Sequence, residues 1–235
     1  MLRLQKHYFG AHDNLGLALR DAGRFDEAIA EFREADRIFK ALNSPRCKSD
    51  PRLVAALRET ESMARAVDRL PAVLEGRDRP VDAGEYLVFG QLCQLPYLKQ
   101  YAAAGRFFDE AFVKQPELAE HLEKQHRYNA ARFAARVGCK RIADAAGLDE
   151  QECARLRGQA LEWLRADLEA WRGLLVNVRD DIDCWNRVSL AMQDWLRNRD
   201  LSGVRGPEAL AKLPEAERQP WQELWRRVEA TLTRM

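Results

Sequence analysis

The chain has 235 residues, of which 46% are hydrophobic and 32% are charged. This composition is too apolar for a disordered chain and too charged for a membrane-embedded one. The 38 lysine and arginine residues nearly balance the 37 aspartate and glutamate residues, and a net charge of +1 argues against a strongly basic nucleic-acid-binding surface. Because the sequence lacks both a long apolar run and a signal-peptide pattern, we expect no membrane contact and a cytoplasmic location.

Apolar residues recur three and four positions apart along most of the chain, the spacing that places them on one face of an α-helix. One such stripe comprises Leu161, Leu164, Leu168, Trp171 and Leu175. Sustained two-residue alternation is absent, so we expect essentially no sheet. The pattern predicts an all-α fold.

Residues 9–42 carry a pattern of small and large side chains. Gly16 and Ala28 are small, which allows two antiparallel helices to cross at close range, and Gly23 separates the helices. The full set of predicted packing positions is Leu15, Gly16, Leu19, Ala28, Phe32 and Ala35. The segment resembles the tetratricopeptide repeat (TPR), with His12 where the family usually has an aromatic residue and Lys40 where it has a final proline.

This resemblance implies helical hairpins that stack as a short, irregular solenoid with a helical C-terminal cap. Shifting the first repeat back by its period of about 34 residues places Met1 in the slot of Ala35 and Leu4 in that of Ile38. We therefore expect residues 1–8 to be the tail of a truncated upstream repeat, with coincidence as the alternative.

Residues 43–80 do not match the repeat. Asp50 precedes Pro51 as a helix cap precedes a first-turn proline, and one long amphipathic helix is expected from Pro51 to about Leu74, with Pro71 near its end or at a kink. A loop from Gly76 to Pro80 follows. We expect this segment to pack between the two recognisable repeats as a spacer.

Residues 81–118 form a second TPR-like copy. Its predicted packing positions are Gly90, Ala104, Phe108 and Ala111. The gap between its glycine and its first alanine is longer than in the first copy, so the turn around Pro96 should be enlarged. Gly105 is expected at a turn.

Residues 119–175 are expected to form a degenerate hairpin with a long insertion. Arg127–Ala131 echoes His12–Gly16, Ala160 and Leu164 fit a second helix, and the polar stretch from Gly138 to about Glu152 reads as the connection. Residues 176–235 are expected to form the cap. All six tryptophans lie beyond residue 160, and we interpret them as core residues rather than as an aromatic cage.

A narrower resemblance covers most of the chain from about residue 9 onward. The strings AHDNLGLALRDAGRFDEAIAEFREA, HRYNAA, QALEWLRADLEAW and LSGVRGPEALAKLPEAERQPWQELW are similar to the C-terminal TPR regions of many planctomycete bacterial proteins, often fused behind a serine/threonine kinase domain. The resemblance implies a regulatory or partner-docking segment. It implies no catalytic activity here, because the kinase portion has no counterpart in these residues.

The search for chemical motifs finds no phosphate-binding glycine loop, kinase signature, nucleophile elbow or zinc-binding helix motif. Five cysteines without a CxxC pair indicate free thiols, and the spacing of His121 and His126 is unsuited to joint metal ligation. The acidic residues 180–183, with Asp194 nearby, read as a solvated loop or helix start. We expect no cofactor, no metal and no enzymatic activity; an unrecognised enzyme would require a pocket with convergent titratable groups.

In the TPR family the first helix of each hairpin lines a concave groove. Carried over to this chain, the predicted partner-binding residues are Asp13, Leu17, Arg20 and Asp21 in the first copy and Leu87, Gln91 and Gln94 in the second. Asp13 and Leu17 stand where the carboxylate-binding type of repeat has lysine and asparagine, so capture of a C-terminal carboxylate is disfavoured. The predicted function is non-catalytic docking of a protein or peptide. The alternative is a regulatory segment of a kinase-type signalling protein, and the partner and oligomeric state stay open.

Overall fold

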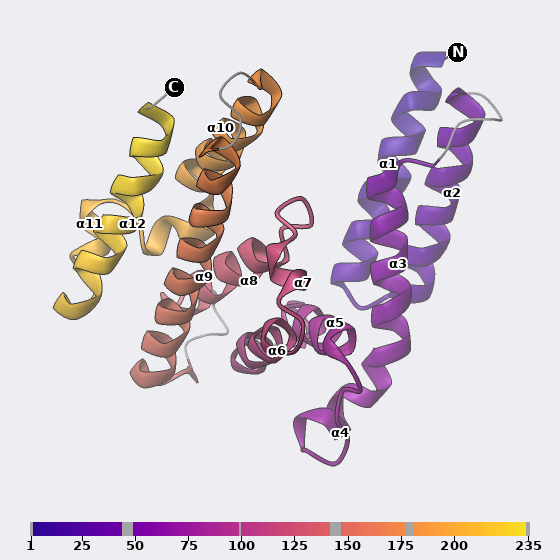
Figure 1. The fold of residues 1–235 in the computed structure, drawn as a ribbon. Coiled ribbons are helices and arrows are strands. Elements are labelled where there is room, and N and C mark those ends of the chain that lie inside the picture. The colour runs from indigo at the N-terminus through magenta and orange to yellow at the C-terminus, as the bar shows by residue number, and fades with distance from the viewer. Residues whose placement is uncertain (1, 44–48, 99, 142–146, 177–180, 234–235) are drawn as a thin grey trace. The chain divides into compact units, whose positions relative to one another are not determined.

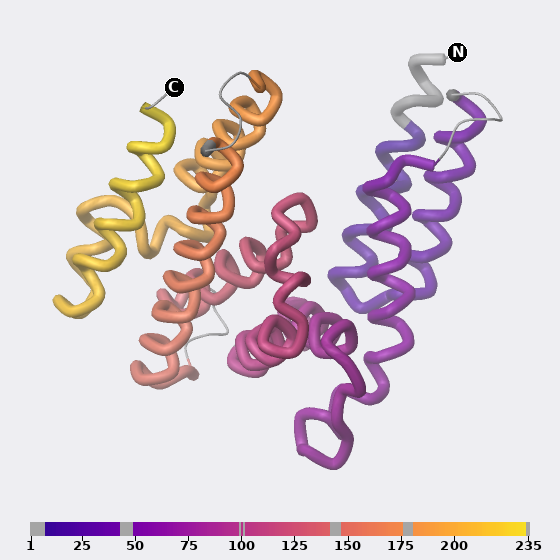
Figure 2. The backbone as a smooth tube through the Cα atoms, viewed as in Figure 1, coloured from indigo at the N-terminus to yellow at the C-terminus, as the bar shows by residue number. Residues whose placement is uncertain are grey.

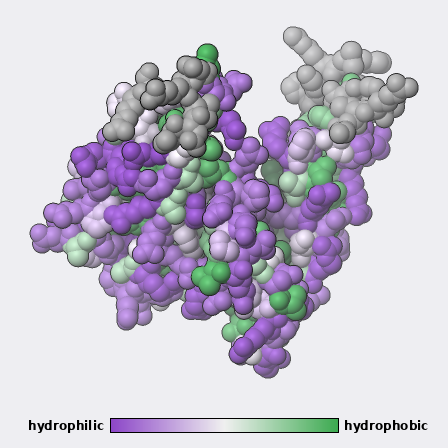
Figure 3. All heavy atoms as spheres, in the orientation of Figure 1, coloured by the Kyte–Doolittle hydropathy of each residue, from purple (hydrophilic) through white to green (hydrophobic). Residues whose placement is uncertain are grey.

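The computed structural model describes residues 2–43, 49–98, 100–141, 147–176 and 181–233. Within these ranges every regular element is a helix, which confirms the all-α prediction (Figure 1). The chain divides into two compact units, residues 1–107 and 108–235, and each is described separately below. Polar residues cover most of the face seen in Figure 3, where apolar side chains gather in small groups.

The first unit opens with a hairpin of α1 (Leu2–Asp21) and α2 (Phe25–Asn43). A Cβ atom placed on Gly16 would lie 2.7 Å from the ring of Phe32, and Ala28 and Phe32 are completely buried. The predicted close crossing of the two helices is therefore confirmed. Gly23 makes the turn between them with a φ of 79°, a left-handed conformation that favours glycine.

Two expectations for this hairpin fail. Leu15 is 47% exposed and does not fill the contact between the helices. Leu15 is one turn before the buried Leu19 and lies toward the same side of the helix, but it is left exposed at the edge of the buried face. In addition, α1 runs without a break from Leu2, so the described backbone has no turn at the boundary expected after residue 8.

The spacer begins as predicted and breaks earlier than predicted. Asp50 caps α3 (Pro51–Ala66) by accepting a hydrogen bond from the Arg52 amide at 2.8 Å. The helix does not continue to Leu74: a 3₁₀ turn, η1 (Val67–Arg69), separates α3 from α4 (Leu70–Leu74). In a continuous helix Pro71 would clash with the carbonyl group of Val67 and donate no hydrogen bond, which explains the interruption.

The spacer packs where it was expected. Helix α3 contacts α2 and α5 (Ala83–Cys93), and its Leu53 joins a core cluster with Leu19, Phe32 and Ala35. Figure 2 shows α1, α2 and α3 side by side.

The second expected repeat is divided between the units. Helix α5 is followed by turn residues 94–98, which include Pro96, and later by α6 (Tyr101–Lys114) and the short α7 (Glu117–Glu120). The ring of Phe107 lies 5.8 Å from that of Phe89, so α6 packs on α5, but the boundary between the units falls after Phe107. Gly105 lies inside α6 and not at a turn. The four predicted packing positions are all buried: Gly90, Ala104, Phe108 and Ala111. The expected contact between Gly90 and Ala104 stays a prediction.

The second unit contains a second antiparallel hairpin, α8 (His126–Gly138) and α9 (Glu150–Val176). Arg127 at the start of α8 binds Asp167 of α9, and Gly138 at its end accepts a hydrogen bond from Arg157, which fixes the antiparallel order. Ala160 and Leu164 are fully buried, as expected for a second helix.

The C-terminal segment forms α10 (Ile182–Arg197), η3 (Arg199–Gly203), α11 (Pro207–Leu210) and α12 (Glu215–Thr233). Helix α12 contacts α9 and α10. Five of the six tryptophans are buried and Trp185 is half-buried, in agreement with the core interpretation. The indole of Trp225 donates to the carbonyl of Val204 at 2.6 Å, which satisfies its one buried polar group.

Candidate partner-binding sites

Two of the predicted partner-binding residues of the first unit, Leu17 and Leu87, are leucines that lose surface to packing. Leu17 is partly buried and packs on the core cluster that contains Leu53 of α3. Leu87 is only 8% exposed. Leu17 packs on a core that includes the spacer, and Leu87 has little exposed surface, so the two leucines do not stand in an open groove.

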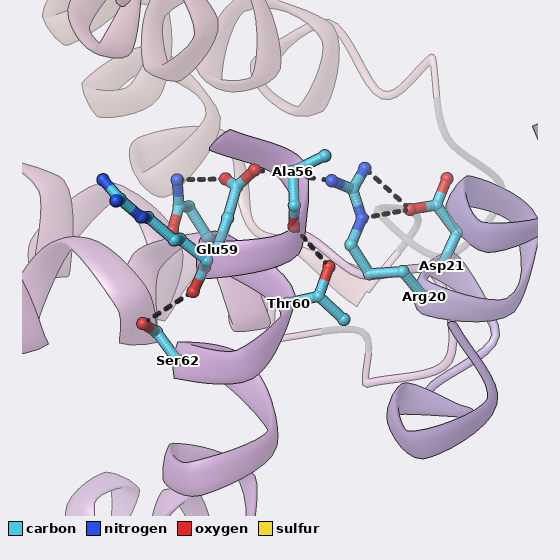
Figure 4. A network of polar contacts seen from close by, with 8 residues as sticks. Arg20, Asp21, Ala56, Glu59, Thr60 and Ser62 are labelled. Atoms are coloured by element: carbon cyan, nitrogen blue, oxygen red, sulfur yellow. Dashed lines mark hydrogen bonds and ion pairs between the residues drawn. The ribbon is translucent and has the colours of Figure 1, made fainter. Parts of the chain in front are cut away.

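Three of the predicted residues do meet, at a carboxylate that sequence reasoning missed. Glu59 of α3 accepts from Arg20 Nη1 of α1 at 3.4 Å and from the side-chain amide of Gln91 of α5 (Figure 4). Arg20 also bonds Asp21 through two nitrogens at 3.2 Å. The network ties three helices of the first unit together.

Burial sets the protonation behaviour of this network. Desolvation raises the pKa of Glu59, and the attraction of Arg20 and the hydrogen bond from Gln91 offset the rise only in part. Arg20 and Gln91 both bind the Glu59 carboxylate, so we assign Glu59 a structural role, in which it holds helices α1, α3 and α5 together.

The other predicted residues are not brought together. Asp13 is half-buried. The side-chain nitrogen of Gln94 is buried and finds no hydrogen-bond partner within the described ranges. These positions do not form a binding groove in the first unit.

The second unit contains a pocket of about 390 Å³ between the residue 122–125 turn and helices α8, α9 and α10. We call it the α8–α10 pocket; its wall includes Leu122, Tyr128, Asp167, Trp171, Leu190 and Asp194. None of these residues was predicted as a site. Asp167 carried a signal, because it is a carboxylate at helical spacing among the apolar residues Leu164, Leu168 and Trp171.

Asp167, one of the residues that line the pocket, belongs to a buried ion pair. Arg127 Nε donates to Asp167 Oδ1 at 2.6 Å, and the two side chains are 12% and 4% exposed. Burial raises the pKa of Asp167 to about 6 even though Arg127 acts in the opposite direction.

A second polar pair stands beside it. The Tyr128 hydroxyl donates to Asp194 Oδ2 at 2.6 Å and accepts from Asn198 Nδ2 at 3.3 Å. The ring of Tyr128 stacks on Trp195 with centroids 5.4 Å apart and an interplanar angle of 5°. Burial and the Asp194 carboxylate raise the pKa of Tyr128, so the phenol stays protonated and acts as a donor.

Other chemistries find little support in the part of the chain that is described. No three histidine, cysteine or carboxylate side chains are grouped there to hold a metal ion. Four cysteines are free, and burial raises the pKa of Cys93 to about 12 and that of Cys139 to about 11, which makes both thiols unreactive near neutral pH. Cys47 lies outside the described residues. Of the described helices, none has the length and apolar character that crossing a bilayer requires.

Comparison of the chain with protein-family models, with curated proteins and with solved structures gives no match.

Proposed function

We propose that the protein is a non-catalytic interaction module of stacked TPR-like hairpins, which docks an extended segment of a partner protein in the α8–α10 pocket. The observation that carries the proposal is the pocket itself, an open cavity with aromatic and aliphatic walls and a few fixed polar groups. Such a lining is typical of binding sites.

The pocket also meets the condition that the sequence set for an enzyme, since Asp167, Tyr128 and Asp194 converge there. Acid–base catalysis needs a group that exchanges a proton with the substrate at the right geometry. Here Arg127 holds Asp167, and Tyr128 and Asp194 bond each other. Because these three side chains are already paired with protein groups, we expect them to hold the pocket in shape and not to exchange protons with a substrate. Binding is therefore the proposed function.

The test is a selection of short random peptides on the intact chain. Docking predicts saturable binders that compete with one another. The Leu190→Glu variant should abolish their binding, because Leu190 stands at the pocket wall and is 66% exposed. Ile182→Glu is the matched control on the same helix, 73% exposed and outside the pocket. Absence of saturable binders, or equal loss in both variants, would overturn the proposal.

The resemblance to kinase-linked TPR regions supports a second candidate, a regulatory segment of a serine/threonine kinase-type protein. Its test is co-purification of the chain with a kinase domain encoded next to it. A complex lost in Leu190→Glu and kept in Ile182→Glu would support it.

A further inference from the structure

The wall of the α8–α10 pocket is acidic. It contains three carboxylates, from Glu123, Asp167 and Asp194, and one guanidinium group, from Arg187. An acidic wall favours a cationic ligand and disfavours an anionic one.

Two of the three carboxylates already have a cation. Glu123 pairs with Arg187 at 2.9 Å, and Asp167 pairs with Arg127 at 2.6 Å. Within the described ranges Asp194 has no cationic partner; it accepts a hydrogen bond from a neutral phenol. Because Tyr128 donates to Oδ2, the other carboxylate oxygen of Asp194 is left to accept from a ligand.

Apolar residues flank Asp194, whose carboxylate is exposed at the pocket. Leu122, Leu190 and Ala191 line the same pocket, and Leu190 is 66% exposed. A ligand that covers Leu190 removes apolar surface from water at about 25 cal/mol per Å². The site therefore places an exposed carboxylate beside an apolar wall, which suits a long aliphatic stem carrying a positive head.

Resting on the proposed docking function, we propose that the α8–α10 pocket takes an arginine or lysine side chain from a basic segment of the partner protein, with its cationic head on Asp194 and its stem on Leu190 and Leu122. A peptide fits better than a free amine, because the exposed leucine at the wall needs a larger apolar surface to cover it. Arginine has the advantage that its planar guanidinium can form paired hydrogen bonds with a carboxylate.

The test uses labelled random-peptide pools that share one fixed central residue: arginine, citrulline, lysine, acetyl-lysine or glutamate. Citrulline keeps the length of the arginine side chain and acetyl-lysine keeps the aliphatic stem of lysine, and both lack the positive charge. Binding to the full chain is followed by fluorescence anisotropy. We expect the arginine and lysine pools to bind at least about tenfold more tightly than their neutral counterparts, a factor that corresponds to about 1.4 kcal/mol.

The variants locate this preference. Asp194→Asn keeps an acceptor for Tyr128 and removes the charge, so the preference should disappear; Asp194→Glu should retain part of it. Asp183→Asn removes one charge from the same helix outside the pocket and should leave the preference intact. Unchanged tryptophan-detected unfolding verifies that Asp194→Asn is folded.

Each other outcome counts against the inference. If neutral or acidic pools bind as tightly as basic ones, the docking function survives and the cationic ligand is wrong. If Asp194→Asn keeps the preference, or if Asp183→Asn loses as much of it, the site is elsewhere on the chain. If no pool binds, both the inference and the proposed function fall.

Discussion

Arg127 and Asp167 form an ion pair of 2.6 Å that is almost wholly removed from solvent and joins the first turn of α8 to α9. Asp167 also lines the α8–α10 pocket, so the pair links helix α8 to a residue of the pocket wall on α9. The stability of the second unit and the shape of the pocket therefore depend on the same contact.

Removing one partner of this pair should be costly. Asp167→Ala leaves the Arg127 charge buried without its counterion, and we expect a loss of about 3–5 kcal/mol. All six tryptophans lie in the second unit, so tryptophan fluorescence in a urea titration reports on that unit alone. The control is Asp183→Ala, which removes an exposed carboxylate of α10 and should change stability by less than about 0.5 kcal/mol. Equal losses of unfolding free energy in the two variants would show that the Arg127–Asp167 pair stabilises the unit no more than an exposed carboxylate does.

The raised pKa of Asp167 predicts a pH dependence with a definite sign. The unfolded carboxyl group titrates near pH 3.9 and the folded one near pH 6, so the folded state binds the proton more tightly. The contribution of Asp167 is fully present below about pH 4 and is lost as the pH rises to about 6, with a total of roughly 3 kcal/mol. Tryptophan-detected urea midpoints should show the slope in the parent chain and a weaker slope in Asp167→Asn. Parallel profiles would contradict the assignment.

Two glycines of α1 should respond in opposite directions to the same substitution. A Cβ atom on Gly16 would meet Phe32 at 2.7 Å, so Gly16→Ala should destabilise the hairpin by about 1–3 kcal/mol. A Cβ atom on Gly10 would meet nothing within 4 Å, and Gly10→Ala should stabilise the helix by up to about 1 kcal/mol. Hydrogen exchange of α1 and α2 measures both effects locally. A gain in protection for Gly16→Ala would refute the close crossing.

Alanine substitutions at Gly23 and Gly76 should distinguish the cost of backbone strain from the cost of a steric clash. Both have a φ near 75–79°, but a Cβ on Gly23 would lie 2.6 Å from the ring of Tyr97, whereas one on Gly76 meets nothing. Each alanine variant should lose about 1–2 kcal/mol from strain, and Gly23→Ala should lose more. Adding Tyr97→Ala should recover only the excess, as measured by circular-dichroism unfolding curves. Equal losses for the two glycines would mean that Tyr97 is free to move aside.

The first hairpin was predictable because its small and large residues follow one helix period and face one partner helix. Leu15 fits the same pattern and is exposed, because spacing fixes the angle of a side chain around the helix and does not supply a neighbour to cover it. Pro71 was recognised as a kink, yet the helix was extended through it; the clash with the Val67 carbonyl decides where the break falls.

The Glu59 network and the α8–α10 pocket were not predicted from the sequence, because each depends on contacts between separate helices. Arg20 and Gln91 are carried over from the TPR resemblance, but their common partner Glu59 lies on the spacer, which does not match the repeat. The α8–α10 pocket combines Tyr128, Asp167 and Asp194, which are far apart in the sequence. Only the packing of three helices brings them together, so no local pattern marks them as one site.

Photo-crosslinking gives the most direct test of where a partner segment docks. A peptide selected on the intact chain would carry a photoreactive group next to its basic residue, and the labelled positions would be read by mass spectrometry. The account predicts labels in the turn at residues 122–125 and on α10 near Leu190 and Asp194. Labels concentrated on α1 and α5 near Arg20 and Gln91 would contradict it.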